Sequence, residues 1–319
     1  MRVHPWRGAR RAALVLVLAA AGLGAGGSVA SAAPVAISLC AVPGTSTPVG
    51  GVSIPIWGFA TGCASPGLPG PVLAVTVGEV VALTITNALP SGHTVTFETP
   101  GIDFDPGPDS APPGGSVTRT FTATAPGTYL YLSAGDAGRQ TAMGLYGALI
   151  VRPATAGQAY LTPASTYDVE APLVLSAIDP DFNAAPESFD MHSYRASYWM
   201  INGRSYPDTA PGITAAGGQR LLLRYLNAGY DNTTMTLLGA HERVVARDGR
   251  PLDSPMDVTA ETIPAGATED VIVTVPAGAG PSPRGFPLYN RQQHVTNGGQ
   301  AGTSPQPVTG GGMVTFIHH

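Results

Sequence analysis

Short apolar runs rich in β-branched residues, separated by Gly, Pro or Asn, make up most of the chain beyond its N-terminal segment. In the first half these runs are residues 72–77, 80–86, 95–97, 118–123, 128–132 and 148–151. Runs of this length are typical of half-buried strands, and tight turns such as Gly78-Glu79 connect them. Roughly eight strands in about 120 residues predict a β-sandwich of two sheets.

The same pattern occurs a second time in the chain. Gly78 and Asn87 in the first half correspond to Gly218 and Asn227 in the second, at a constant offset. Because several blocks keep their order, they indicate one structural unit that is present twice. We therefore expect an all-β protein with two tandem β-sandwich domains of Greek-key type.

The predicted boundaries follow from the weakly patterned stretch 154–166, which is typical of a linker. It separates a first domain at residues 34–153 from a second domain at residues 167–319. Residues 1–33 predict a signal peptide, because four arginines precede the apolar run 12–23 and small residues suited to a signal peptidase follow it. The arginine pair in this segment leaves both the general secretory route and the twin-arginine route open.

Export predicts a protein that is secreted or kept in the cell envelope. No later apolar run reaches the roughly 20 residues that a membrane span requires, so we expect no span in the mature chain. Of the 319 residues, 44% are hydrophobic and 12% are charged, and the formal net charge is −5. This composition excludes a disordered tail, a coiled coil and a protein that binds nucleic acid through phosphate contacts.

The two cysteines, Cys40 and Cys63, both lie near the start of the predicted mature chain. In an oxidising compartment they favour a disulfide, which would stabilise the fold by roughly 3 kcal/mol. The alternative is a copper thiolate, which needs histidines nearby. The segment between the two cysteines contains none.

Several blocks resemble the first two cupredoxin domains of multicopper oxidases. In the first unit they are residues 69–73, 126–131 and 144–151, and in the second unit residues 201–204, 223–228 and 244–249. The resemblance implies cupredoxin-like domains and, in the family, two His-x-His pairs in the first domain that bind a three-copper cluster. The positions of the first pair fall on Thr96 and Glu98, and those of the second pair on Leu132 and Ala134. All four imidazoles are therefore expected to be missing.

The family also carries a third domain with a His-Cys-His motif for a blue copper, and no such motif occurs in this sequence. Three other histidines are the remaining candidates for a nonstandard metal site: His93, His241 and His294. The ordinary interpretation of His93 is a solvated loop residue, and that of His241 is a structural residue. A metal site would require these distant histidines to converge.

These observations favour an exported multicopper-oxidase-like protein that acts as a copper-free binding or scaffold module for an unknown protein partner. Sheet edges and a long loop over 281–307 are the candidate surfaces. The alternative is a copper-binding oxidoreductase, either with a nonstandard site or completed by a partner chain. The sequence leaves the enzymatic question open and favours a role without catalysis and without a cofactor.

Overall fold

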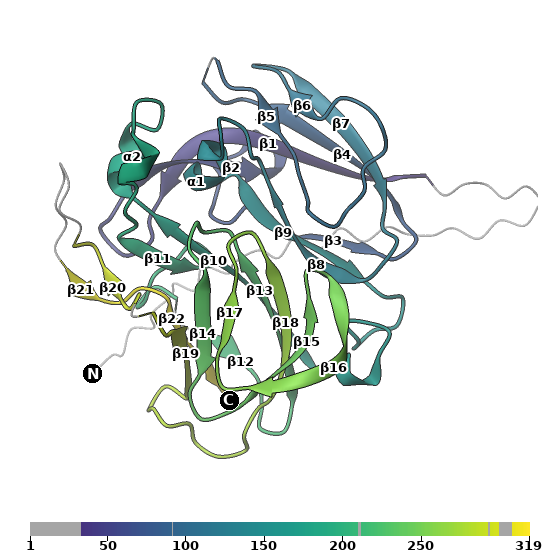
Figure 1. Cartoon of the computed structure of the whole chain (residues 1–319), viewed down its shortest axis with the longest axis vertical. Coiled ribbons are helices and arrows are strands. Elements are labelled where there is room, and N and C mark those ends of the chain that lie inside the picture. Colours follow the sequence, from purple (N-terminus) through teal and green to yellow (C-terminus); the bar gives the residue numbers. More distant parts are fainter. Residues whose placement is uncertain (1–32, 91, 210–211, 293, 300–307) are drawn as a thin grey trace, which may run out of the picture.

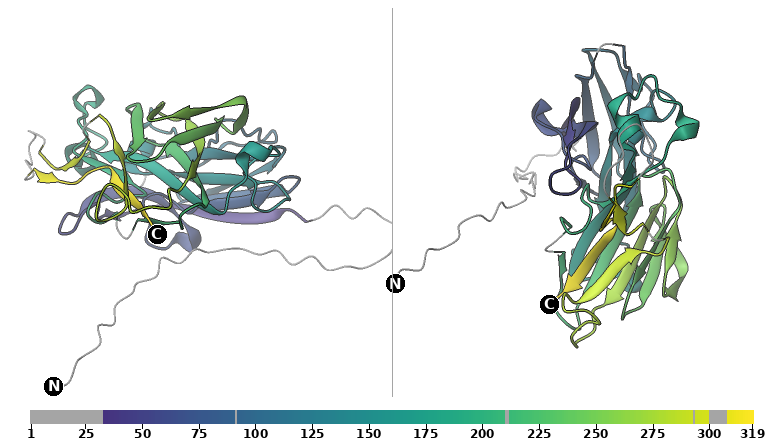
Figure 2. Two further views of the ribbon diagram at one scale, coloured as in Figure 1. Left: turned by 90° about the horizontal axis from the view of Figure 1, so that it is seen from below. Right: turned by 90° about the vertical axis from the view of Figure 1, so that its left-hand side faces the viewer.

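The computed structural model describes residues 33–90, 92–209, 212–292, 294–299 and 308–319. Almost all of the predicted signal peptide lies outside these residues. The described part consists of two β-sandwiches, and Figure 2 shows them end to end, with the first domain in purple to blue and the second in green to yellow. The prediction of an all-β chain with two tandem sandwiches is confirmed.

Domain 1 has two facing sheets and a short ribbon (Figure 1). The first sheet, in the order β2-β1-β4-β7, contains β1 (Val35–Ser46), β2 (Ile54–Ala60), β4 (Val80–Asn87) and β7 (Ser116–Thr122). The second, in the order β3-β9-β8, contains β3 (Leu73–Thr76), β8 (Gly127–Leu132) and β9 (Tyr146–Arg152). The ribbon pairs β5 (Val95–Thr96) with β6 (Ser110–Ala111).

Domain 2 has a larger sheet in the order β16-β15-β18-β13-β10-β11-β20-β21. Its strands are β10 (Val169–Ile178), β11 (Tyr198–Ile201), β13 (Arg220–Asn227), β15 (Glu242–Arg247), β16 (Arg250–Val258), β18 (Thr268–Thr274), β20 (Thr296–Asn297) and β21 (Thr309–Gly310). The facing sheet, in the order β12-β22-β19-β14-β17, contains β12 (Ile213–Thr214), β14 (Thr233–Leu237), β17 (Glu261–Ile263), β19 (Phe286–Asn290) and β22 (Val314–His318).

Helical segments are short and lie between strands. They are η1 (Thr61–Cys63), α1 (Arg139–Met143), η2 (Pro163–Ser165), α2 (Pro180–Ala184) and η3 (Met191–Ser193). Within the described ranges, no helix has the length and apolar character needed to cross a membrane. The prediction of one long loop over 281–307 is wrong, because β19 and β20 lie within it and alternate apolar residues of β19 pack into the core.

The internal repeat has a direct structural counterpart. Strands β4 and β13 occupy equivalent places, since each pairs in parallel with the first strand of its domain and antiparallel with a later one. Each ends at a buried asparagine, Asn87 or Asn227, whose Nδ2 donates to two carbonyl oxygens and whose Oδ1 accepts from the residue two positions on. The asparagine closes the turn in both domains because its side chain replaces backbone partners there.

Aromatic packing fills the core of domain 1. The Tyr131 ring stacks on Phe97 at 5.3 Å and meets Phe59 edge-on at 5.7 Å. Its hydroxyl donates to the carbonyl oxygen of Pro71 at 2.7 Å. A side chain at Gly147 would overlap the Tyr131 ring, because a Cβ there would lie 2.3 Å from the ring carbon that carries the hydroxyl. This strand needs glycine at that position for the tyrosine to fit.

The predicted disulfide is confirmed. Cys40 on β1 and Cys63 of η1 are bonded, with their Cα atoms 4.9 Å apart. Cys40 is 1% exposed and packs with Val42 and Ala60. The bond therefore fastens the turn after β2 back onto β1.

Candidate functional site

The two pairs of predicted ligand positions lie on neighbouring segments of domain 1, one at and after β5 and the other at and after the end of β8. Glu98 and Leu132 form a single antiparallel bridge, in which each backbone nitrogen donates to the other residue's carbonyl oxygen at 2.9 Å. Thr96 Oγ1 lies 3.2 Å from the hydroxyl of Ser133, the residue between Leu132 and Ala134 in the sequence. The structure thus brings together the two segments that the resemblance singled out.

The side chains at these positions offer little to a metal ion. Leu132 is half-buried and packs against an apolar cluster that includes Leu130 of domain 1 and Val174 of domain 2. Ala134 and Glu98 are exposed. Only the Glu98 carboxylate and the Thr96 hydroxyl carry donor atoms, and neither is an imidazole.

A chain of hydrogen bonds leads from this region to His93. The Ser133 hydroxyl donates to Gln140 Oε1 at 2.7 Å, and Gln140 Nε2 donates to Asp136 Oδ2 at 2.8 Å. The same Asp136 oxygen accepts from His93 Nδ1 at 2.8 Å. Ser133 and Gln140 are fully buried, so this chain fixes the loop between β8 and α1.

His93 is buried between two carboxylates from different parts of the chain. It is 8% exposed, its ring lies 4.5 Å from the Trp57 ring, and its Nε2 lies 3.2 Å from Glu187 Oε1. Carboxylates only accept hydrogen bonds, so each ring nitrogen of His93 faces an acceptor. The solvated-loop interpretation of His93 is wrong.

His93 also lines a pocket of about 310 Å³ at the edge of domain 1. The other lining residues are Trp57, Gly92, Asp136, Arg139, Pro186 and Glu187. Charges of both signs meet here: His93 contacts Asp136 and Glu187, and Arg139 Nη2 donates to the Phe189 carbonyl oxygen at 3.1 Å. The pocket is therefore an open polar cleft between domain 1 and the segment after α2.

The three candidate histidines have separate surroundings. His294 stacks on Trp199 at 4.5 Å with an interplanar angle of 9°, and burial lowers its pKa. His241 is exposed before β15. Across the described ranges, no group of three or more His, Cys, Asp or Glu side chains is arranged to hold a metal ion. No contact joins His93, His241 and His294 to one another in this part of the chain.

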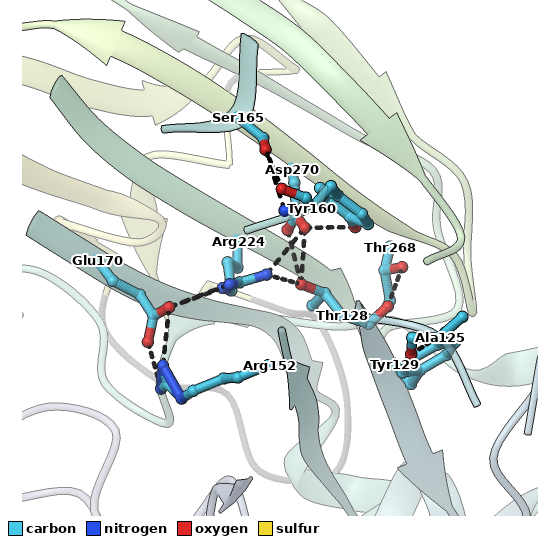
Figure 3. Close-up of polar contacts among 10 residues, drawn as sticks. All are labelled: Ala125, Thr128, Tyr129, Arg152, Tyr160, Ser165, Glu170, Arg224, Thr268 and Asp270. Carbon is cyan, nitrogen blue, oxygen red and sulfur yellow. Dashed lines mark hydrogen bonds and ion pairs between the residues drawn. The ribbon is translucent and has the colours of Figure 1, made fainter. Parts of the chain in front are cut away.

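A buried polar network joins the two domains (Figure 3). Arg224 on β13 is fully buried, and its Nη1 donates to Asp270 Oδ2 on β18 at 3.0 Å. The same nitrogen donates to the Thr128 hydroxyl at 2.7 Å, and that hydroxyl donates to Asp270. Thr128 belongs to β8 of domain 1. One hydroxyl therefore connects domain 1 to two charged residues of domain 2.

Further partners complete the charge balance around Arg224. Its Nε and Nη2 donate to Glu170 Oε2 at 3.1 and 3.0 Å, and Arg152 pairs with the other Glu170 oxygen at 2.5 Å. Tyr160, in the predicted linker, donates to Asp270 at 2.7 Å. Burial alone would lower the pKa of Arg224, but Asp270 and Glu170 outweigh it and raise that pKa. Sequence reasoning missed this network, although an arginine inside the apolar run 221–226 was a visible signal.

Known proteins of one family share similarity with this chain. The family model described as multicopper oxidase matches residues 60–156. A curated multicopper oxidase of Mycobacterium tuberculosis is 26% identical over 251 residues, which cover 67% of this chain and 48% of that protein. Laccase-3 of Oryza sativa subsp. japonica is 27% identical over 229 residues, which cover 65% of this chain and 39% of that protein.

The chain is similar to multicopper oxidases over these matched residues. It spans less than half the length of these two curated relatives. Among solved structures, a blue copper oxidase from Nitrosomonas europaea matches with a TM-score of 0.74 at 23% identity, covering 89% of this chain and 86% of that one. A copper nitrite reductase from the same organism has a TM-score of 0.70 at 22% identity, with 89% and 93% covered. These likenesses confirm the cupredoxin fold.

Copper, which the family implies, does not fit the donor set at the predicted positions. Cu(II) prefers imidazole nitrogen, and a blue site also needs a thiolate. Leu132 and Ala134 have no donor atoms, and both cysteines are held in the disulfide. The multicopper oxidase frame is present in domain 1, whereas its ligand chemistry is not present at these positions.

Domain 2 carries two buried carboxyl groups that the family resemblance does not explain. The Tyr225 hydroxyl donates to Glu242 Oε1 at 2.5 Å, and Arg247 Nε donates to Glu269 Oε2 at 2.9 Å. The second oxygen of each carboxyl group is buried without a hydrogen-bond partner among the described residues. Burial raises the pKa of Glu242 to about 7 and that of Glu269 to about 8. Both groups are therefore protonated to a large extent near neutral pH.

Proposed function

We propose that this multicopper-oxidase-like protein is a copper-free binding or scaffold module. The observation that carries the proposal is the donor set on the two facing strands, where Leu132 and Ala134 replace the second His-x-His pair. The hydrogen bonds that connect Thr96 to His93 support it further, because they occupy the polar groups nearest to these positions. A protein partner in the envelope or medium is the expected ligand.

Copper retention tests the proposal. Purified protein is loaded with Cu(II), dialysed, and analysed for metal content and for oxidation of a phenolic dye. We expect much less than one copper per chain and no oxidation. The matched control is the variant T96H/E98H/L132H/A134H, which places imidazoles on the same frame and should retain more copper than the wild type. Stoichiometric copper together with dye oxidation by the wild type would overturn the proposal.

The competing function is a copper-dependent oxidoreductase that uses a nonstandard site or a partner chain. The names of its relatives favour it, since they are copper oxidases and laccases. If the wild type retains copper, the variants His93→Gln, His241→Gln and His294→Gln identify the ligand. Loss of copper in one of them would establish the nonstandard site, and retention in all three would point to a ligand outside this set.

Export is part of the same proposal. The disulfide supports it, because such bonds persist in oxidising compartments. We expect the secreted or envelope form to begin near Ala33 or Pro34. N-terminal sequencing of the protein recovered outside the cytoplasm checks this, and an intact N-terminal segment in that fraction would contradict it.

A further inference from the structure

A second, larger pocket lies at the end of domain 2, away from the ligand positions of domain 1. It has a volume of about 570 Å³, within the range that small-molecule sites occupy. The loop before β19 and the end of β22 form its walls. The lining residues are Ala279, Gly280, Ser282, Pro283, Arg284, Gly285, Phe316, His318 and His319. In Figure 1, the label C and the loop that leads into β19 lie at this same end of domain 2.

Arg284 is the one charged side chain of this lining. Two histidines lie beside it, and the lining contains no aspartate or glutamate side chain, although the chain as a whole has a formal net charge of −5. Arg284 takes part in none of the ion pairs found among the described residues. A guanidinium without a carboxylate partner, beside two imidazoles, is a site for an anion.

The loop holds Arg284 in a defined place. Ser282 and Gly285 exchange backbone hydrogen bonds at 3.2 and 2.9 Å. The backbone nitrogen of Arg284 donates to the Ser282 hydroxyl at 3.0 Å. Gly280 packs so closely on Gly285 that a Cβ at Gly280 would lie 2.2 Å from its carbonyl carbon. The turn is therefore tight, and it fixes the backbone position of Arg284.

Aromatic rings lie beneath the guanidinium. Its central carbon is 5.5 Å from the centre of the Tyr206 ring and 6.0 Å from that of Phe316. Phe316 is half-buried and lines the pocket, so an apolar surface adjoins the cationic group. A ligand that combines a flat apolar group with a negative charge would contact both.

One of the two histidines leaves capacity for such a ligand. His318 Nε2 lies 3.1 Å from the Thr214 hydroxyl, and His319 Nε2 donates to the carbonyl oxygen of Gly278 at 3.2 Å. These contacts fix the rings and use one nitrogen of each. When His318 Nε2 accepts from the Thr214 hydroxyl, its Nδ1 can donate to a ligand, whereas His319 already donates to Gly278.

We infer that this pocket binds a small aromatic anion, such as an aryl carboxylate or sulfonate, through Arg284 and the Phe316 ring. The inference does not depend on the proposed function, because the pocket shares no residue with the positions tested for copper. Arg284 supplies the charge and the two hydrogen-bond donors that suit a carboxylate. Phe316 supplies the apolar wall.

The probe for the test is 8-anilinonaphthalene-1-sulfonate, titrated into the full folded chain and followed by fluorescence. We expect saturable binding at one site per chain. Benzoate should displace the probe, whereas benzylamine, which has a similar ring and the opposite charge, should not. Sodium chloride should weaken binding, because the arginine is exposed to solvent.

Two variants and a control make the test decisive. Arg284→Gln should weaken the probe at least tenfold, and His318→Gln should weaken it less. Arg243→Gln, which alters an exposed arginine paired with Asp257 at 3.0 Å on another part of the domain, should bind like the wild type. Circular dichroism confirms that each variant is folded. Unchanged affinity in Arg284→Gln, or equal displacement by benzylamine and benzoate, would overturn the inference.

Discussion

The two domains share a fold and differ in what they bury. Domain 1 packs aromatic rings around Tyr131, and its fully buried polar groups are neutral ones such as Ser133 and Gln140. Domain 2 buries ionisable groups, namely Arg224, Asp270, Glu242 and Glu269. The same β-sandwich fold therefore supports two kinds of interior. Both domains have an apolar core, to which domain 1 adds a disulfide and domain 2 adds buried ionisable groups.

The largest expected effect comes from breaking the buried pair in domain 2. Arg224→Met leaves the buried Asp270 without its cation, while Glu170 keeps Arg152. We expect a loss of about 3–5 kcal/mol in the free energy of unfolding. Urea denaturation measures it. The control Arg243→Met removes an exposed ion pair and should cost less than about 1 kcal/mol. Similar losses in the two variants would show that the network is not the main support of this domain.

The second effect belongs to domain 1. Replacing both cysteines, as Cys40→Ala with Cys63→Ala, opens a loop whose ends are 23 residues apart. The chain-entropy model gives a loss of roughly 3 kcal/mol. Thermal unfolding of the oxidised wild type and the variant measures the difference. Addition of a reductant should lower the melting temperature of the wild type and leave that of the variant unchanged.

The third effect is a pH dependence that domain 2 should show. The folded-state pKa values of Glu242 and Glu269, about 7 and about 8, lie above the ordinary value of 4.5. Stability from these groups is therefore fully present below pH 4.5 and is lost as the pH rises through 7 and 8. We expect the free energy of unfolding to fall between pH 4.5 and pH 8.

Glu269→Gln provides the comparison for this pH dependence. The amide cannot ionise, so denaturation at pH 5 and pH 8.5 should differ less in the variant than in the wild type. Equal pH dependence in the two proteins would rule out Glu269 as its source.

The smallest effects test the internal repeat. Asn87→Ala and Asn227→Ala each remove a side chain that satisfies three backbone groups, and each should cost about 1–2 kcal/mol. Equal costs would extend the equivalence of the two domains from geometry to energetics. A large cost in one domain alone would limit that equivalence to the backbone.

The sequence was sufficient for features that depend on local pattern. Strand runs, the repeat of Asn87 and Asn227, and the pairing of Cys40 with Cys63 all follow from spacing and residue type. The fold could be predicted because each sandwich repeats the same turns and strands. The placement of Glu98 beside Leu132 was expected from the family resemblance, since the two pairs bind one cluster in its members.

Contacts between distant residues could not be predicted in the same way. His93 meets Glu187 94 positions away, and Thr128 meets Asp270 142 positions away. A charged residue in an apolar run indicates that a buried residue of opposite charge pairs with it, but the surrounding sequence does not show which residue this is. Arg224 shows this: its position was visible in the sequence, and Asp270, Glu170 and Thr128 were not.

The bond from Thr128 to Arg224 and Asp270 has a consequence for recognition. Bending the molecule between its two halves would break the contacts of Thr128 with Arg224 and Asp270 and expose this buried pair to water. The two halves therefore present one preformed shape to a ligand. A partner that contacts both domains would therefore bind with a small loss of conformational entropy, because the two domains are already fixed relative to each other. Loosening this joint should slow complex formation even where every residue that touches the partner is left unchanged.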